Sequence, residues 1–65
     1  MRETQSYSVS VELTVVEAYA LAQLCKRIGW RDAASLAVDK YEAQNMLDAC
    51  DRVRDGLANV GVIVR

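Results

Sequence analysis

Three aspartates follow one another at helical spacing in the C-terminal half of the chain. Asp48, Asp51 and Asp55 are three and four residues apart, so a helix would place them on one side. Such a helix advances about 10 Å from Asp48 to Asp55, a distance that covers about three phosphates on one strand of duplex DNA. The pattern is typical of a solvated helix face, and it also suits a surface that occupies a basic patch on a partner protein.

Residue types that catalyse reactions or bind metals are scarce. The chain contains no histidine and two cysteines, a poor set of ligands for zinc. It also lacks a glycine-rich phosphate loop, and helix capping accounts for Glu42 and Asp39. We therefore expect a protein that is not an enzyme and that carries no metal and no cofactor.

Length and composition predict one small, ordered domain over residues 1–65, with a frayed polar lead over residues 1–6. The chain has no proline, is 52% hydrophobic and carries a net charge of -1, so no overall charge favours nucleic acid or an anionic membrane. The first residues, MRETQSYS, are too polar for a signal peptide, and no apolar run is long enough to span a membrane. We expect a cytoplasmic protein in which Cys25 and Cys50 are buried free thiols, although a disulfide between them is geometrically conceivable.

The first half of the chain predicts a strand followed by a helix. Apolar and polar residues alternate over residues 7–13, as in a half-buried strand. Thr14 and Glu17 have the spacing of a capping box, which predicts that a helix starts there and runs to Ile28. Gly29 is placed to adopt the left-handed conformation after that helix. Trp30 then folds back as the largest side chain in the core.

The second half predicts a long helix and a second strand. Residues 31–38 form one to two helical turns, or a turn whose Leu36 and Val38 close the core. Asp39 caps a helix that extends to Gly61, with Gly56 set against another backbone. Residues 62–64 read as a strand. The apolar stripe of the long helix consists of Ala43, Met46, Leu47, Cys50, Val53, Leu57 and Val60.

These elements combine into an α+β fold of the order β-α-(α)-α-β. The two strands form an antiparallel sheet that packs against two main helices and a short connecting helix. Because two strands alone are marginally stable, the sheet depends on helix packing or on pairing with another chain.

Two further surfaces are candidates for binding. Val16, Tyr19 and Gln23 lie opposite the core stripe of the first helix and form a candidate dimer or partner surface. The alternative is that the chain after Trp30 folds over them. Near the end of the same helix lies a basic cluster with an interleaved aromatic side chain, as in some nucleic-acid clamps. It consists of Lys26, Arg27, Trp30 and Arg31, and helix-end preferences together with burial of Trp30 favour a structural role for it.

Three sequence segments resemble very short phage and mobile-element proteins of mostly unassigned function. The segments are SVSVELT, EAYALAQLCKRIGW and LAVDKYEAQNMLDACDRVRDGLANVG. The resemblance covers Ser8 to Gly61, and its most distinctive part is the LAVD turn at residues 36–39. Among proteins of this kind, the chain resembles anti-CRISPR inhibitors of type I systems.

That resemblance implies a protein that binds a subunit of a type I CRISPR surveillance complex and blocks target DNA engagement. It would act in the cytoplasm of the infected bacterial host, without direct nucleic-acid or membrane binding. Asp48, Asp51 and Asp55 would carry the contact, and Glu42 and Asp39 would extend this acidic edge. The near-neutral net charge departs from the acidic balance of such inhibitors. Two alternatives stay open: a small dimeric regulatory or structural module that pairs through its strand edge or through Val16 and Tyr19, and a DNA-binding repressor.

Overall fold

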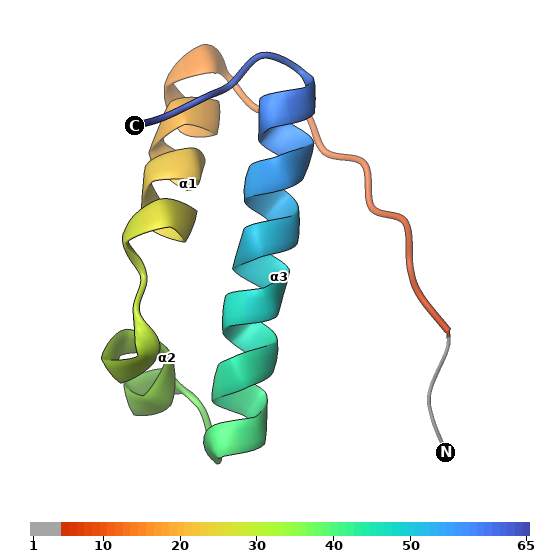
Figure 1. The fold of residues 1–65 in the computed structure, drawn as a ribbon. Helices are drawn as coiled ribbons and strands as arrows, with labels where there is room; N and C mark the ends of the chain where they lie inside the picture. Colours follow the sequence, from red (N-terminus) through yellow and green to blue (C-terminus); the bar gives the residue numbers. More distant parts are fainter. Residues whose placement is uncertain (1–4) are drawn as a thin grey trace.

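The computed structural model describes residues 5–65 and forms three helices in that range (Figure 1). They are α1 (Val15–Arg27), α2 (Trp30–Leu36) and α3 (Lys40–Asn59). The described residues contain no strand, so the predicted α+β fold with a two-stranded sheet is wrong. Of the frayed lead predicted over residues 1–6, residues 1–4 lie outside the described part.

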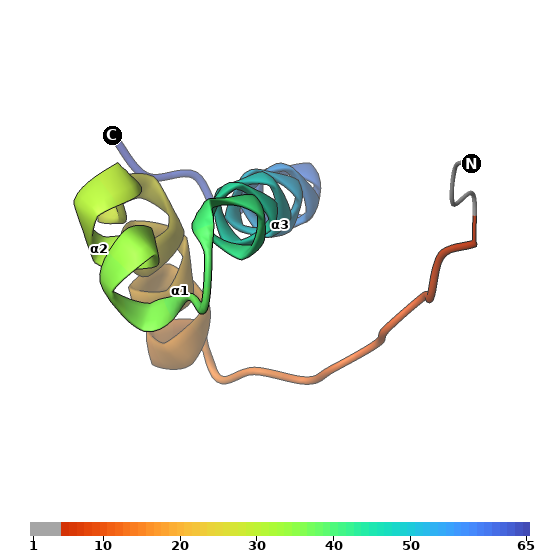
Figure 2. The same ribbon diagram turned by 90° about the horizontal axis from the view of Figure 1, so that it is seen from below.

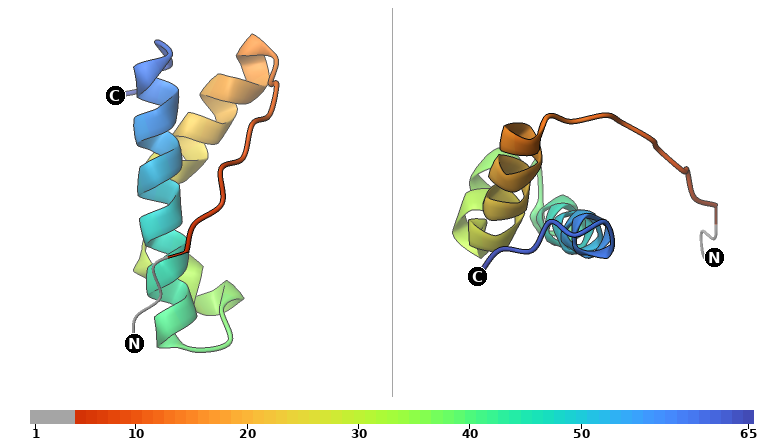
Figure 3. Two further views of the ribbon diagram at one scale, coloured as in Figure 1. Left: turned by 90° about the vertical axis from the view of Figure 1, so that its right-hand side faces the viewer. Right: turned by 90° about the horizontal axis from the view of Figure 1, so that it is seen from above.

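The two segments that were predicted to be strands are extended but unpaired in the described structure. The 7–13 segment precedes α1 and the 62–64 segment follows α3, and neither pairs with the other. They leave the helices on different sides: the first passes the C-terminal end of α3 and runs outward, whereas the second turns back beside α1 (Figures 1 and 3). The alternation over residues 7–13 identified a segment able to form a strand. Its predicted partner, the 62–64 segment, runs beside α1 and does not pair with it.

The predicted capping box starts α1. The backbone N–H of Thr14 donates to Glu17 Oε1 at 2.9 Å, and the N–H of Glu17 donates to Thr14 Oγ1 at 3.1 Å. The helix ends at Arg27, one residue before the predicted end, with Ile28 as the extended C-cap. Capping at the start was therefore read correctly from the sequence.

The connection after α1 differs from the prediction. Gly29 has φ -116° and ψ -178°, so it is extended and serves as the N-cap of α2 instead of adopting a left-handed conformation. Its N–H donates to Asp32 Oδ2 at 3.0 Å. Trp30 consequently begins α2 and is 48% exposed, so its predicted role as the main core side chain is wrong.

The short helix predicted over residues 31–38 is confirmed as α2. Leu36 and Val38, which the alternative placed in the core, are exposed. Asp39 caps α3 as predicted, and its Oδ1 accepts from the N–H of Glu42 at 2.8 Å. At the other end, α3 stops at Asn59, and Gly61 follows with φ +96°, the left-handed conformation that glycine adopts easily at helix ends.

The helices α1 and α2 pack against α3 (Figure 2). The interior between them is built from small side chains. The buried residues of the described range are Ala18, Ala22, Cys25, Ala33 and Ala43. Most of the predicted α3 stripe is only half-buried, and Val53 and Val60 are exposed. The prediction that Gly56 is set against another backbone is wrong, since a Cβ placed there meets no atom of another element within 4 Å.

Candidate functional site

One exposed side of α3 presents the predicted row of carboxylates. We call Asp48, Asp51 and Asp55 the acidic face; all three are exposed. Gln44 Nε2 donates to Asp48 Oδ1 at 3.0 Å, which orients the first of these carboxylates. Within residues 5–65, none of the three forms an ion pair with a basic side chain. The acidic face is therefore open to an external cation.

Asp39 and Glu42, predicted to extend this face, are engaged at the start of α3. Asp39 Oδ1 accepts from the N–H of Glu42, and Glu42 Oε1 accepts from the N–H of Val38 at 2.8 Å. Both carboxylates thus satisfy backbone donors that the helix leaves unpaired. Their charges also interact favourably with the helix dipole, so each has a structural role whether or not it contacts a partner.

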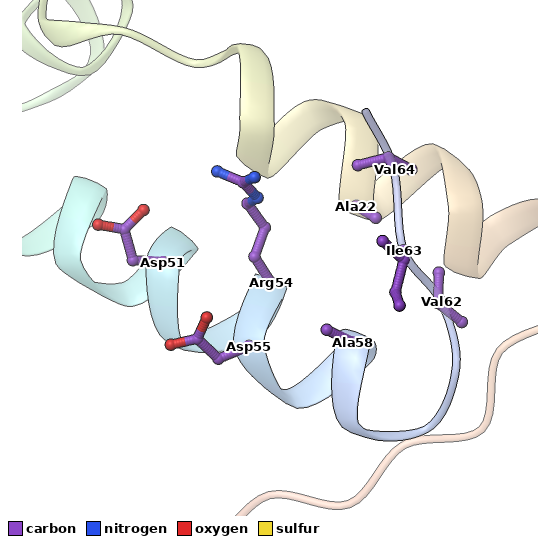
Figure 4. Close-up of a pocket in the computed structure, with 8 residues that line it drawn as sticks. All are labelled: Ala22, Asp51, Arg54, Asp55, Ala58, Val62, Ile63 and Val64. Atoms are coloured by element: carbon purple, nitrogen blue, oxygen red, sulfur yellow. The ribbon is translucent and has the colours of Figure 1, made fainter.

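A hollow of about 380 Å³ adjoins the acidic face (Figure 4). In Figure 4, Asp51 and Asp55 lie on one side of it, and Arg54 projects toward α1 between them and the C-terminal segment. The remaining lining residues are Ala22, Ala58, Val62, Ile63 and Val64. Sequence reasoning missed this hollow because it assigned residues 62–64 to a sheet, away from the inner edge of α3.

The second predicted surface is divided by the structure. Tyr19 lines an apolar groove with residues of the α3 end, whereas Gln23 lines a different hollow beside α2. The Oε1 atom of Gln23 is buried without a hydrogen-bond partner in the described residues. Val16 is exposed but is in neither lining. Tyr19 and Gln23 therefore lie at two different hollows.

The apolar groove that contains Tyr19 has a volume of about 310 Å³. It lies where the 7–13 segment, the start of α1 and the end of α3 meet. Its lining residues are Val11, Leu13, Val15, Ala18, Tyr19, Leu57, Val60 and Val62. None of these side chains is charged, so the groove suits apolar side chains. The sequence indicated Tyr19 but not its neighbours from the other end of the chain.

The two cysteines are free thiols, as predicted. Cys25 is buried as predicted, whereas Cys50, which was also predicted to be buried, is only half-buried. Burial raises the pKa of the Cys25 thiol to about 11, and a hydrogen bond and the charge of nearby Cys50 add to the rise. A thiol with such a pKa is a poor nucleophile and metal ligand at neutral pH. No cluster of three or more metal-binding side chains occurs in the described range.

The basic cluster at the junction of α1 and α2 is more accessible than expected. Lys26, Arg27 and Arg31 are exposed, and so is Trp30 between them. Burial of the indole was one reason to assign this cluster a purely structural role. The structure removes that reason, while the nearly balanced net charge still disfavours nucleic acid.

Comparison with known proteins places the chain in a family. The profile of a family of unknown function, DUF7706, matches residues 1–65. The chain belongs to this family. No curated protein and no solved structure matches this DUF7706 chain. None of the three helices in its described part is both long and apolar enough to cross a membrane.

Proposed function

We propose that this DUF7706 protein is a non-catalytic inhibitor that binds a protein partner through the acidic face of α3. The observation that supports this proposal is the exposure of Asp48, Asp51 and Asp55, none of which is in an ion pair within the described residues. Carboxylates that form no ion pair within the described residues keep their charge available to a cationic surface, which favours association and selects its orientation.

The proposed partner surface is a basic patch that otherwise binds the phosphates of DNA. In its most specific form, the partner is a subunit of a type I CRISPR surveillance complex, and binding blocks engagement of target DNA in the cytoplasm of the infected bacterium. Support comes from the resemblance of residues 8–61 to very short phage and mobile-element proteins, among which the chain resembles anti-CRISPR inhibitors, together with the acidic face. The inhibitor requires no cofactor and contacts neither nucleic acid nor membrane.

Neutralising the acidic face tests this proposal. We compare wild type with Asp51→Asn/Asp55→Asn in a mobility-shift assay of target-DNA binding by purified type I surveillance complexes. The loss of two contacting charges is expected to weaken inhibition about tenfold or more. Ala34→Lys/Ser35→Lys is the matched control, because it changes net charge by the same amount on the exposed α2. Circular dichroism verifies that both variants fold.

Four outcomes would count against the proposal. Equal inhibition by wild type and the aspartate variant would exclude the acidic face, and equal weakening by the control would show that only net charge matters. Failure of the wild type to inhibit any of the complexes would exclude the specific partner class. Salt-sensitive binding of wild type to duplex DNA alone would instead favour the basic cluster around Trp30 and a DNA-binding role.

A further inference from the structure

The 7–13 segment has the pattern of a strand but pairs with no other segment of residues 5–65. Its apolar side chains are exposed to a degree that falls toward the helices: Tyr7 93%, Val9 81%, Val11 69% and Leu13 38%. Its backbone forms no hydrogen bond with any described residue, and it extends away from the helices (Figures 2 and 3). An unpaired apolar strand of this kind is a template for pairing with another chain.

The apolar groove provides a surface for the apolar side of such a pairing. Val11 and Leu13 enter the groove from the segment itself, and Tyr19 and Leu57 line it from α1 and α3. The apolar side of the segment is therefore continuous with the groove. A second strand beside the first would extend this apolar layer, with its own apolar side chains facing the same way.

The exposed area of the single chain is large for its mass, and the extended 7–13 segment contributes to it. The chain exposes 5603 Å², whereas a folded monomer of 7.2 kDa exposes about 4,100 Å². The surplus of about 1,500 Å² exceeds the roughly 800 Å² that each partner buries in a standard protein interface. Among residues 5–65, no large side chain is fully buried. The surplus has the size of a protein interface, and the extended 7–13 segment contributes part of it.

We propose that a second copy of the chain covers the exposed apolar side of the 7–13 segment. The 7–13 segments of the two copies then pair as an antiparallel ribbon over the apolar groove. A two-fold interface is self-complementary, and this segment meets that condition when Ser10 lies opposite Ser10 of the second copy. Tyr7 then faces Leu13, and Val9 faces Val11. All apolar side chains fall on one side of the ribbon.

The same register is also compatible with the charges and polar groups of the segment. Glu12 lies opposite Ser8 of the second copy, so no two carboxylates face each other. The polar side of the ribbon carries Ser8, Ser10 and Glu12 from both copies and faces water. A shift by one residue would place Val9 opposite Ser10 and turn apolar side chains of one strand to the polar side.

The first test is the mass of the purified full chain by sedimentation equilibrium at micromolar concentration. We expect a dimer of wild type, a monomer of Val9→Lys, and a dimer of the matched control Ser8→Lys. Both variants introduce the same side chain at adjacent positions, on the apolar and polar sides respectively. A monomeric wild type, or a Val9→Lys variant that remains dimeric, would overturn the proposal.

The second test reports the register and does not depend on a folded monomer. Under mild oxidation, Ser10→Cys should form a disulfide-linked dimer, because the two introduced thiols face each other across the two-fold axis. Ser8→Cys is the control: its two thiols would be separated by four residues, or about 13 Å along the strands, beyond disulfide reach. Wild type controls for Cys25 and Cys50, and peptide mapping identifies the linked residue. Equal cross-linking of Ser8→Cys and Ser10→Cys would overturn the register.

This inference is independent of the acidic face. The variant Asp51→Asn/Asp55→Asn should remain dimeric, because both residues lie outside the apolar groove. Conversely, the inhibition assay can fail while the chain still forms this dimer, and the two outcomes are thus distinguishable. Loss of the dimer in the aspartate variant would contradict the interface proposed here.

Discussion

Thr14 and Glu17 exchange hydrogen bonds, each side chain accepting from the other's backbone N–H at 3.1 and 2.9 Å respectively. This pair lies at the junction between the 7–13 segment and α1. It therefore sets both the start of the helix and the direction in which the preceding segment leaves it.

Loss of the Thr14 hydroxyl should destabilise the protein. Thr14→Ala leaves the N–H of Glu17 without its acceptor, which we expect to lower the free energy of unfolding by about 1 kcal/mol. Urea denaturation followed by circular dichroism measures the change. Ser6→Ala, in the exposed extended segment, should leave the midpoint unchanged, and an equal loss there would argue against the capping explanation.

Alanine should have opposite effects at the two glycines of the C-terminal region. Gly56 lies within α3 with open space at its Cβ position, so Gly56→Ala should stabilise the protein by about 0.5–1 kcal/mol. Gly61 has φ +96°, and Gly61→Ala should destabilise it by about 1 kcal/mol or more. Thermal unfolding of the two variants would show melting temperatures on opposite sides of wild type. A lower melting temperature for Gly56→Ala would indicate that this face packs against something else.

Variants at Asp39 separate helix capping from partner binding. Asparagine is as good an N-cap as aspartate, whereas alanine is not. We expect Asp39→Asn to retain most of the stability and Asp39→Ala to lose about 1 kcal/mol, measured by urea denaturation. If Asp39 acts only as a cap, Asp39→Asn also inhibits like wild type in the surveillance-complex assay. Weaker inhibition at unchanged stability would add Asp39 to the binding surface.

Stability should fall at alkaline pH because of Cys25. Burial raises the pKa of this thiol from 9.0 to about 11, so the unfolded chain loses its proton at lower pH than the folded protein. The contribution of the protonated Cys25 thiol to the free energy of unfolding is complete below pH 9 and is lost as the pH rises through 11. The free energy of unfolding is lower by about 2 kcal/mol at pH 11 for this reason. The measurement is the difference in urea midpoint between wild type and Cys25→Ala at about pH 8 and about pH 11. A difference that does not change with pH would contradict the raised pKa.

Local signals in the sequence were sufficient to locate the helices. The caps at Thr14 and Asp39 and the spacing of Ala18, Ala22 and Ala43 depend only on nearby residues, and the structure follows them. The exposure of the acidic face followed from the same periodicity. These features can be predicted because three or four residues along a helix determine which side chains are neighbours.

The sheet was mispredicted because strand pairing depends on residues that are distant in sequence. The alternation of apolar and polar residues over 7–13 predicts that one side of this segment is apolar. It does not predict which other segment or chain packs against that side. The error at Trp30 has a different cause: Gly29 can be left-handed or extended, and its hydrogen bond to Asp32 selects the extended form. The hollow beside Arg54 was missed because its wall of residues 62–64 depends on the turn at Gly61.

The alanine-rich interior has a consequence for how this family can vary. Ala33 and Ala43 are completely buried, so a larger residue at either position must push helices apart, at a cost of about 1–3 kcal/mol. Substitution by a smaller residue, the usual way in which core substitutions destabilise a protein, can remove only one methyl group at each of these two positions. DUF7706 sequences should therefore diverge freely in the size of their surface residues while these two positions stay restricted to alanine, glycine, serine and cysteine.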